Sequence, residues 1–572
     1  SEQVFVDGNM LTLAQWPNTT TSIKAYPSGT IPAVDISHPA KSVITSFVSK
    51  TNVGGVTIGV VTDTNLPVRP PGFYEGAQIF FQPNNGAWSW AFSGVVSNVT
   101  GSQLTLTTVN GSGKDFSDKI YDSASRYYLF NKKEFLDAPG EWWQDTANGR
   151  LYAIMPDSGS PVGHTVEVKK RDFAFDLSGR SYITVKGLHL FACTITTDTA
   201  AAGNGRHEGY PWRGKDAGVA PAHHIVLDGL DAKYLFHFTD TSGHFYLQWG
   251  QGSGIILSGS DCVLQNSRLQ FSAGNGVTVL GQRNQVLNNF FYDLDYAAVD
   301  GSAICTGGAS VTVDHEIAFN TIARMGRSGI TPRSLQNSNP TNLVARIHHN
   351  DISECMLQDW DGGGIYATAD AKFVRIDHNL VHDISGFTSS GIYPDFSRNY
   401  VFDHNVIWNV EWGIHIQGQV ENENNVLCYN NTIAVKNTCA TPYGPFGFGN
   451  SNGKNNGTVI CNNLICCLNP KAAPGYKAVS GGFEGAEITN NLAWDAVAGS
   501  ASDPKFVDAA SFSFQLSSNS PARDAGAVIP IYVRDGISVM PFSDATDGKP
   551  VFGAYEFGAK LWRAGATSPN RR

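Results

Sequence analysis

The chain has 572 residues, of which only 16% are charged and 60 are glycine, and its formal net charge is −10. Low charge with abundant Gly, Asn, Ser and Thr is typical of many short strands joined by tight turns, and it excludes a mainly helical protein. The acidic balance disfavours nucleic acid as a partner, which needs clustered Lys and Arg, and no run approaches the ~18 apolar residues that span a membrane.

We expect residues 1–165 to form a β-rich N-terminal region with an inserted β-sandwich. Its first residues are typical of a hairpin with a two-residue turn near Gly8 and Asn9. A second hairpin is expected over 140–153, where the chain leads into the next region. The sandwich strands are expected where apolar and polar residues alternate, at 78–81, 88–92 and 104–107.

Residues 166–495 contain an internal repeat, which is the strongest signal in the chain. Its template is an aliphatic residue, two variable residues and Asn, and the Asn spacings run from 23 to 32 residues. A second template, a small residue followed by Ile or Val, lies between them. The repeated Asn residues are Asn266, Asn289, Asn320, Asn350, Asn379, Asn405, Asn430, Asn462 and Asn491.

One repeat of this length cannot bury its apolar face alone, so the repeats must stack. Stacking produces parallel sheets with coils ~4.8 Å apart, and it predicts a right-handed parallel β-helix that begins near 166–168 and 183–185. An Asn at one position in every coil can form a ladder, each amide bonding the backbone of the next coil. The variable spacing indicates loops inserted at the turns, where function usually concentrates.

The chain has nine cysteines, and the odd number leaves at least one thiol free. Most lie in strand-like runs, where Cys behaves as a small buried apolar residue. One or two disulfides remain an alternative, with Cys439 as a candidate.

Residues 496–572 are expected to form the last coil and a C-terminal cap. A cap shields the open edge of the last coil from pairing with another chain. The sequence begins without a signal peptide, so we expect Ser1 to follow a processing site in a secreted protein.

Four segments carry a family resemblance: "VFVDG…LTLAQWPN", "LDAPGEWWQD…GRLYAIMPDSG", "DLSGRSYITVKGLHL" and "GKPVFGAYEFG". In them the chain resembles large right-handed parallel β-helix glycoside hydrolases, nearest to the lacto-N-biosidase and β-xylosidase types. The resemblance covers nearly the whole chain and implies a carbohydrate substrate. In such proteins a coil or two precedes the VFVDG-like segment, so we expect an upstream piece that was removed or is a separate chain.

Acidic residues are the candidate catalytic groups. Asp300 and Asp361 each precede the Ile of the second template by four residues, so both fall in one column, two coil steps or about 9.6 Å apart. Glycoside cleavage needs two carboxyl groups, and ~6.5–9.5 Å suits inversion. Asp359, in the loop of Asp361, offers a closer grouping. The resemblance to the lacto-N-biosidase type implies instead the pair Asp293 and Asp300.

Several residues around these acids are candidate substrate contacts. Arg327 and Arg333 lie in the intervening coil, and Arg333 beside a carboxylate would keep it ionised, as a nucleophile or base requires. Asp395 and His415 are expected in one strand column further along. Four aromatic residues can stack on sugar faces: Trp360, Tyr366, Tyr393 and Trp412.

Structural roles compete with these functional ones. Asp-Gly is a common turn dipeptide, and grouped carboxylates can hold a structural calcium ion. The residues directly before three ladder positions, His349, His378 and His404, predict a solvated or stacked structural row rather than metal ligands. We expect no metal or other cofactor in the reaction.

Three functions remain open at this point. The first is a glycoside hydrolase with paired aspartates. The second is a polysaccharide lyase that acts by β-elimination on a uronate polymer, with Lys372, Arg375, Arg333 or His349 as base or neutralising cation. The third is a non-catalytic glycan-binding adhesin. The acid-rich, base-poor cluster favours hydrolysis.

Overall fold

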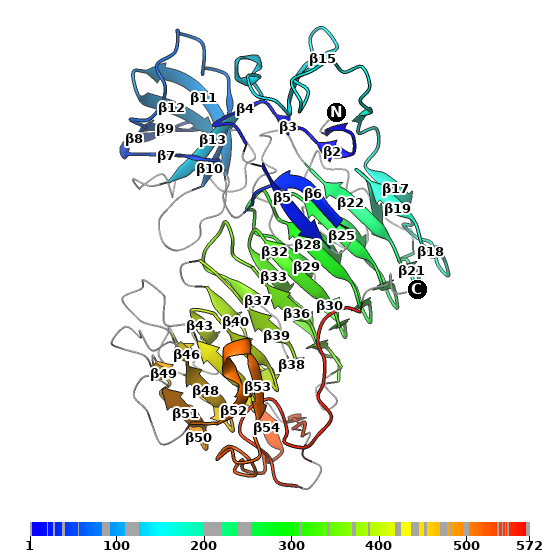
Figure 1. Cartoon of the computed structure of the whole chain (residues 1–572), viewed down its shortest axis with the longest axis vertical. Coiled ribbons are helices and arrows are strands. Elements are labelled where there is room, and N and C mark those ends of the chain that lie inside the picture. The colour runs from blue at the N-terminus through cyan, green and yellow to red at the C-terminus, as the bar shows by residue number, and fades with distance from the viewer. Residues whose placement is uncertain are drawn as a thin grey trace.

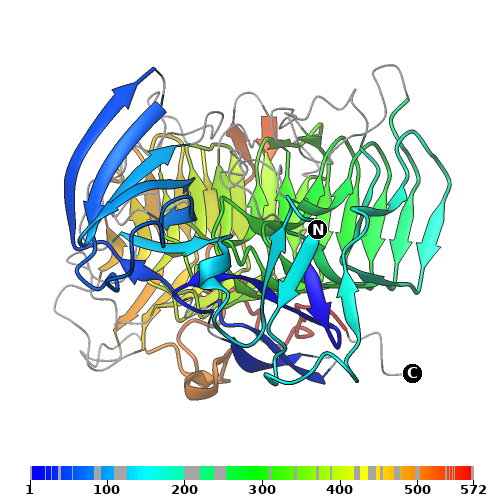
Figure 2. The ribbon, with the colours of Figure 1, turned by 90° about the horizontal axis from the view of Figure 1, so that it is seen from above.

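The computed structural model is a right-handed parallel β-helix with an antiparallel sheet and short hairpins at its side (Figure 1). Seen from above, the coils stack side by side along one direction (Figure 2). The structure describes residues 3–19, 21–26, 29–36, 40–54, 56–82, 92–108, 125–198, 220–237, 253–307, 312–339, 344–368, 373–386, 389–417, 425–435, 446–450, 455–468, 477–480, 482–495, 503–534, 537–539, 541–543, 545 and 548–567.

Three parallel sheets of eleven strands each form the coil, and the chain visits them in turn. Sheet 1 consists of β17 (Phe173–Asp176), β20 (Thr194–Thr196), β23 (Ser253–Leu257), β26 (Asn275–Val279), β29 (Ser302–Thr306), β33 (Ser328–Pro332), β37 (Gly363–Thr368), β40 (Ser390–Asp395), β43 (Trp412–Ile416), β46 (Phe446–Asn450) and β49 (Lys477–Ser480).

Sheet 2 consists of β18 (Thr184–Lys186), β21 (Val226–Asp228), β24 (Val263–Gln265), β27 (Gln285–Leu287), β31 (Glu316–Ala318), β35 (Arg346–His348), β38 (Val374–Asp377), β41 (Tyr400–Asp403), β44 (Leu427–Tyr429), β47 (Val459–Cys461) and β50 (Glu487–Thr489). Sheet 3 consists of β19 (His189–Phe191), β22 (Asp231–Phe236), β25 (Arg268–Ser272), β28 (Phe290–Leu294), β32 (Thr321–Met325), β36 (Asp351–Ser353), β39 (Leu380–His382), β42 (Val406–Trp408), β45 (Thr432–Val435), β48 (Leu464–Cys467) and β51 (Leu492–Asp495).

The small-residue and Ile template forms the centre of the sheet 1 strands. Ile330, Ile365 and Ile392 are successive register partners, and all three are fully buried. The residue before each Ile faces the corner with sheet 3, where a Cβ at Gly391 would lie 2.4 Å from Cγ2 of Ile407. The template therefore needs a small residue because the neighbouring sheet leaves no room for a side chain.

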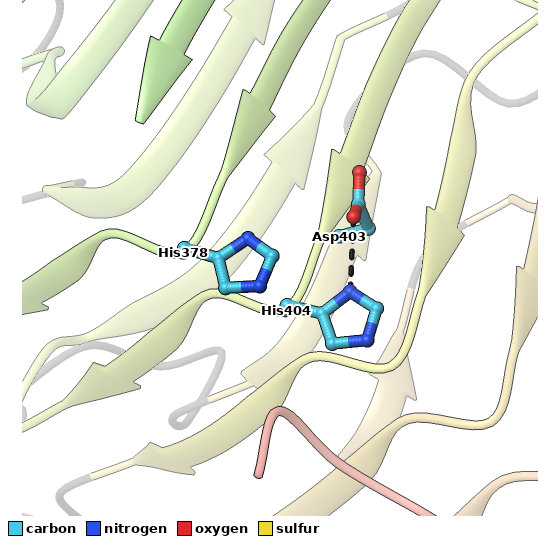
Figure 3. Close-up of side chains that lie close together, drawn as sticks. All are labelled: His378, Asp403 and His404. Carbon is cyan, nitrogen blue, oxygen red and sulfur yellow. Dashed lines mark hydrogen bonds and ion pairs between the residues drawn. The ribbon is translucent and has the colours of Figure 1, made fainter. Parts of the chain in front are cut away.

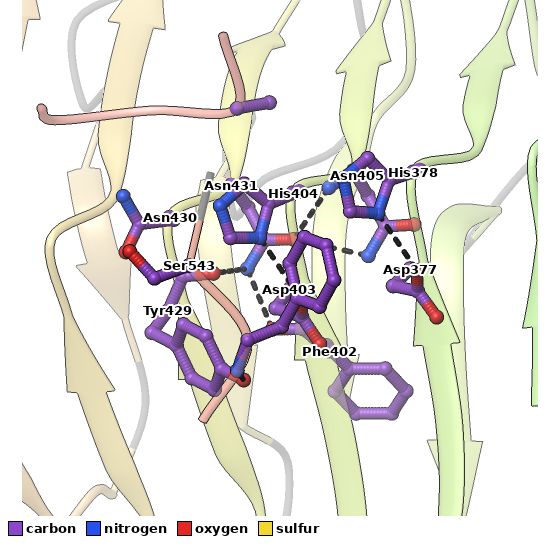
Figure 4. A network of polar contacts seen from close by, with 12 residues as sticks. Asp377, His378, Phe402, Asp403, His404, Asn405, Tyr429, Asn430, Asn431 and Ser543 are labelled. Carbon is purple, nitrogen blue, oxygen red and sulfur yellow. Dashed lines mark hydrogen bonds and ion pairs between the residues drawn. The ribbon is translucent and has the colours of Figure 1, made fainter. Parts of the chain in front are cut away.

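The predicted Asn ladder is present, as Figure 4 shows around Asn405 and Asn431. In each step the amide oxygen accepts hydrogen bonds from the backbone N–H and the amide of the Asn in the preceding coil, at 2.9–3.1 Å. The members are Asn289, Asn320, Asn350, Asn379, Asn405, Asn431, Asn463 and Asn491.

Three residues expected in this ladder lie outside it. Asn266, Asn430 and Asn462 occupy the position one residue earlier in their coils, with φ of 51°, 52° and 54°. This position takes the left-handed conformation in every coil that contains a ladder Asn, and Asn adopts that conformation more readily than most residues. Asn430 and Asn462 are each followed directly by a ladder Asn, so the template did not distinguish the ladder position from the left-handed position before it.

The N-terminal region contains an eight-stranded antiparallel sheet, the N-terminal sheet, whose described strands share one apolar core. Its strands are β4 (Gln15–Trp16), β7 (Ser42–Val43), β8 (Ser46–Val53), β9 (Val56–Thr62), β10 (Gln78–Gln82), β11 (Phe92–Thr100), β12 (Gln103–Thr108) and β13 (Arg126–Phe130). The strands expected at 78–81 and 104–107 are therefore confirmed, whereas residues 88–91 lie outside the described part of the chain.

Two hairpins precede and follow this sheet. The first joins β1 (Val4–Val6) to β2 (Asn9–Met10) through a turn at Asp7 and Gly8, one residue earlier than expected. The second joins β14 (Glu141–Asp145) to β15 (Arg150–Ala153), as predicted. The strand β16 (Val166–Val168) was expected to begin the coil, but it pairs with β1, so the three long sheets begin at β17 to β19.

Short elements complete the described fold. Two-stranded sheets pair β5 (Thr21–Tyr26) with β6 (Gly29–Val34) and β30 (Thr312–Val313) with β34 (Leu335–Gln336), and β3 (Thr12–Leu13) runs parallel to β14. Short 3-10 helices occur at Lys133–Phe135 and Ala509–Ser511. No helix in the described residues is long and apolar enough to cross a membrane.

The C-terminal region lies along the side of the coil (Figure 1). Its hairpins, β52 (Phe506–Asp508) with β53 (Ser513–Leu516) and β54 (Tyr532–Arg534) with β55 (Ile537–Val539), pack on the outer faces of sheets 3 and 2. The last described residues continue along the turns between these sheets, where Thr567 donates its N–H to Asn288 at 2.7 Å. These contacts cover the lateral faces of the coil, a different role from the end cap expected for this region.

The described cysteines are free thiols. Seven of the eight are buried, which confirms the expectation that they fill space in the coil. The disulfide candidate Cys439 lies outside the described residues.

Candidate active site

The outward face of sheet 1 carries a row of buried aromatic rings. Tyr366 and Tyr393 are register partners with ring centroids 5.3 Å apart, and the Tyr393 ring stacks on His415 at 4.2 Å. The half-buried ring of Trp412 lies 4.1 Å from His415. Three of the four aromatic residues that were expected to contact substrate, Tyr366, Tyr393 and Trp412, therefore form one continuous group beside the acids.

Arg327, in the turn before β33, is the centre of the acidic group. It is 1% exposed, forms ion pairs with Asp300 and Asp359, and donates a hydrogen bond of 2.9 Å to the backbone oxygen of Asp361. Its guanidinium also lies 4.8 Å above the ring of Tyr366. One buried cation thus joins three of the four predicted catalytic residues.

Asp300 contacts two arginines. Besides Arg327, Arg333 donates to Oδ2 of Asp300 at 3.2 Å from the adjacent coil. The side chain of Asp300 is 2% exposed, so both of its oxygens are taken up by guanidinium groups in a buried setting. Charge-assisted pairs of this kind hold a carboxylate in a fixed orientation.

The half-buried Asp361 and the buried Asp395 have raised pKa values. Burial raises the pKa of Asp361, and the neighbouring charge of Asp359 adds to the rise while Arg327 opposes it. Burial likewise raises the pKa of Asp395 to about 6, although the Tyr366 hydroxyl donates to it at 2.7 Å. A carboxyl group of this kind retains its proton at a higher pH than usual, as a general acid must.

Asp295 belongs to the same group and was not predicted. It is fully buried, one oxygen accepts the N–H of Val299 at 3.0 Å, and the other has no hydrogen-bond partner. Burial raises its pKa well above the ordinary value, and the charge of Asp359 adds to the rise. Gly301 and Gly326 lie against Asp295, where a Cβ would collide with it, but no sequence pattern indicated this contact.

Asp293 pairs with a different arginine from the other predicted acids. Its carboxylate, 1% exposed, pairs with Arg324 at 3.0–3.3 Å and lines a cavity of about 260 Å³ together with Glu141 and Tyr234. The backbone of Asp293 is in the left-handed region, with φ of 50°. The pairing of Asp293 with Asp300 is therefore not supported by the geometry.

The column expected for Asp395 and His415 is also wrong. Asp395 is the bridge partner of Gln417, whereas His415 stacks on Tyr393, two residues earlier along the neighbouring strand. Both residues still face the same side of sheet 1, because side chains two residues apart in a strand point to one face. Burial lowers the pKa of His415 to about 3, so its ring is neutral.

Trp360 and Asp361 are half-buried residues of the loop that also carries Asp359. The N–H of Trp360 donates to Asp359 at 2.8 Å, which orders this loop from within. Asp359 itself is fully buried. Asp361 is therefore the acid of this loop that lies nearest to solvent, with Trp360 beside it.

The histidine row on sheet 2 is a stack, as expected. The rings of His349, His378 and His404 lie 4.9 Å apart and within 5° of parallel, and Phe542 and Trp562 pack edge-on against them. Potential ligand atoms of His378, Asp403 and His404 lie within 4.8 Å of one another (Figure 3). The lone pairs of parallel imidazoles point in parallel, however, so they do not converge on one ion.

The lyase candidates are engaged elsewhere or undescribed. Arg375 pairs with Asp403 on sheet 2, and His349 stands in the histidine stack. Arg333 is paired with Asp300, and Lys372 lies outside the described residues. The described residues therefore place only Arg333 of these candidates beside the acids.

A comparison with protein-family models agrees with the fold. A family model for the right-handed beta helix region matches residues 244–388. No curated protein matches the chain. A solved structure described as a glycoside hydrolase has 14% identity and a TM-score of 0.48, over 80% of this chain and 76% of that one.

Two further solved structures have lower scores. A PL6 family polysaccharide lyase from Pseudopedobacter saltans has 12% identity and a TM-score of 0.29, over 57% of this chain and 91% of that one. A GH87 alpha-1,3-glucanase from Streptomyces thermodiastaticus has 12% identity and a TM-score of 0.29, over 85% of this chain and 97% of that one.

Proposed function

We propose that the protein is a secreted glycoside hydrolase whose acid site lies on the outward face of sheet 1. The observation that carries this proposal is the gathering of Asp300, Asp359 and Asp361 around the buried Arg327. Carboxyl groups in one site whose environments differ in this way suit the separate roles of acid and base. This chemistry calls for no cofactor.

Asp361 is the proposed general acid. Its pKa is raised, and it is the most exposed of the clustered acids. It would give its proton to the oxygen of the leaving sugar. Asp300, whose oxygens are held by Arg327 and Arg333, is the proposed carboxylate that attacks the sugar or activates water.

The half-buried indoles of Trp360 and Trp412 are the proposed sugar-stacking surfaces. Both lie beside the acids and keep part of their ring accessible, which Tyr366 and Tyr393 do not. An indole face covers the apolar face of a sugar ring, and ring edges or neighbouring polar groups bind its hydroxyls.

The test is a screen of neutral oligosaccharides that includes substrates of the lacto-N-biosidase and β-xylosidase types. We expect hydrolysis of at least one glycan by the wild-type protein and strongly reduced hydrolysis by Asp361→Asn, with NMR of the first anomer formed distinguishing retention from inversion. A product that absorbs in the ultraviolet would instead identify a lyase. Glycan binding that survives Asp300→Asn and Asp361→Asn, without cleavage by the wild type, would identify an adhesin.

A further inference from the structure

The N-terminal sheet packs directly against the loop that carries the acids. Phe80 of β10 and Phe130 of β13 form one apolar cluster with the coil segment Ala297–Val299. That segment lies between Asp295 and Asp300 in the chain. The contact therefore places the N-terminal sheet beside the acid site, although the two regions are far apart in sequence.

Gln358, the residue before Asp359, is the polar centre of this contact. From the coil, its N–H donates to the oxygen of Gly326 at 3.0 Å, and its side-chain amide donates to the oxygen of Tyr296 at 2.9 Å. Only 3% of Gln358 is exposed, so water does not satisfy its remaining groups. These remaining groups are the backbone oxygen and the side-chain oxygen.

Three residues of the N-terminal region bind those two oxygens. Gln82 and Arg126 donate to the backbone oxygen of Gln358 at 2.7 and 3.1 Å. Lys41 donates to its side-chain oxygen at 3.1 Å and to Oε1 of Gln82 at 3.0 Å. A buried oxygen that loses such donors retains its full desolvation cost, so this contact holds the loop strongly in one place.

The charge of Asp359 acts on both basic side chains of this contact. Burial lowers the pKa of Lys41, and the charges of Asp359 and Asp295 oppose that change. Burial also lowers the pKa of Arg126, and Asp359 again opposes it. Both cations therefore lie within the electrostatic field of Asp359 as well as on the hydrogen-bonding groups of Gln358.

We propose that Lys41, Gln82 and Arg126 form a clamp that positions the loop bearing Asp359 and Asp361. The inference rests on the proposed function, because it makes the N-terminal region a working part of the acid site. Few contacts separate the clamp from the acids. The clamp binds Gln358, Asp359 is the next residue in the chain, and Arg327 donates to the backbone oxygen of Asp361. The three clamp residues are positioning residues, and none of them acts on the substrate.

Kinetics of clamp variants test this role. Lys41→Met and Gln82→Leu remove the donors while keeping much of the side-chain volume, and we expect kcat to fall 10- to 100-fold with KM within two-fold, because small displacements of reacting groups cost this much. Arg126→Lys keeps a donor and should restore most of the loss seen in Arg126→Met. The matched control is Lys24→Met, which breaks the ion pair with Asp35 in the same region and should leave kcat unchanged.

Amide hydrogen exchange provides a readout that does not depend on activity. In Lys41→Met we expect faster exchange in a peptide covering 356–362, with the peptides of sheet 2 unchanged, since loss of the clamp frees this loop first. Unchanged kcat and unchanged loop exchange in folded Lys41→Met and Gln82→Leu would overturn the clamp. A wild-type protein that cleaves no glycan would overturn the proposed function, and the exchange result would still decide whether the clamp orders the loop.

Discussion

Buried aspartates and arginines lie on two faces of the coil, and the two groups differ in their ratio of acids to bases. On sheet 2, Asp377 pairs with Arg346 and Asp403 pairs with Arg375. Each of these aspartates also bonds the histidine that follows it, His378 or His404 (Figure 4). On sheet 1, Arg327 is shared among Asp300, Asp359 and the backbone of Asp361, and Arg333 also pairs with Asp300.

This difference appears in the acidity of the carboxyl groups. Burial alone would raise the pKa of Asp377, but the hydrogen bonds and charges of Arg346 and His378 outweigh it and lower the pKa. On sheet 1, burial raises the pKa of Asp295, Asp361 and Asp395, and it outweighs the opposing charge of Arg327. Acids that are each paired with a base, as on sheet 2, indicate a structural role. Acids that outnumber the bases around them, as on sheet 1, indicate groups that can exchange protons.

The largest expected effect distinguishes the two faces by activity. Asp361→Asn removes the proposed proton donor, so kcat should fall by about 10³-fold, or about 4 kcal/mol of transition-state stabilisation. Thermal unfolding should change little, because the variant no longer buries an acid. Asp261→Asn, which alters an exposed aspartate paired with Arg283, is the control and should keep wild-type kcat.

The second prediction applies the same comparison to stability. Arg375→Met leaves the fully buried Asp403 without its arginine, so the free energy of unfolding should fall by about 3–5 kcal/mol in urea titrations. The folded fraction should retain wild-type kcat, since Arg375 lies on sheet 2. A clear loss of kcat in fully folded protein would show that the two faces are not independent.

The third prediction concerns pH. Asp395 has a folded-state pKa of about 6 against an ordinary value of 3.8, so the unfolded chain releases this proton first and stability falls as pH rises from about 4 to 6. Asp395→Asn should remove this dependence, and its stability relative to wild type should rise by about 2–3 kcal/mol across that window. Urea midpoints at pH 4, 5 and 6 measure it, and a constant difference would contradict the raised pKa.

The smallest expected effect tests the proposed stacking surface. Trp412→Ala should raise KM about 10-fold, equivalent to about 1.4 kcal/mol, with kcat within two-fold, because it removes binding made equally in ground and transition states. Trp494→Ala, on sheet 3 beside Phe506, should leave KM unchanged. An equal rise of KM in both variants would argue for a general loss of folding.

The repeat was readable because each coil must solve the same packing problem. A small residue is required before Ile365 and Ile392 because the corner there has no space for a side chain. The ladder Asn is required because its amide bonds the backbone of the neighbouring coil. Where two Asn residues are adjacent, as at Asn430 and Asn431, the pattern could not tell the left-handed turn position from the ladder. The fold and the gathering of Asp300 and Asp361 follow from this periodicity.

Local sequence determined that the chain is a parallel β-helix and which coils hold the acids, because those features depend on residues a fixed number of positions apart. Tertiary structure alone decided that Asp295 lies in the field of Asp359 and Asp300 while Asp293 pairs with Arg324, since neither contact follows from the repeat. It also alone decided that Lys41 and Arg126 reach Gln358, because docking of a region more than 200 residues away leaves no periodic trace in the sequence.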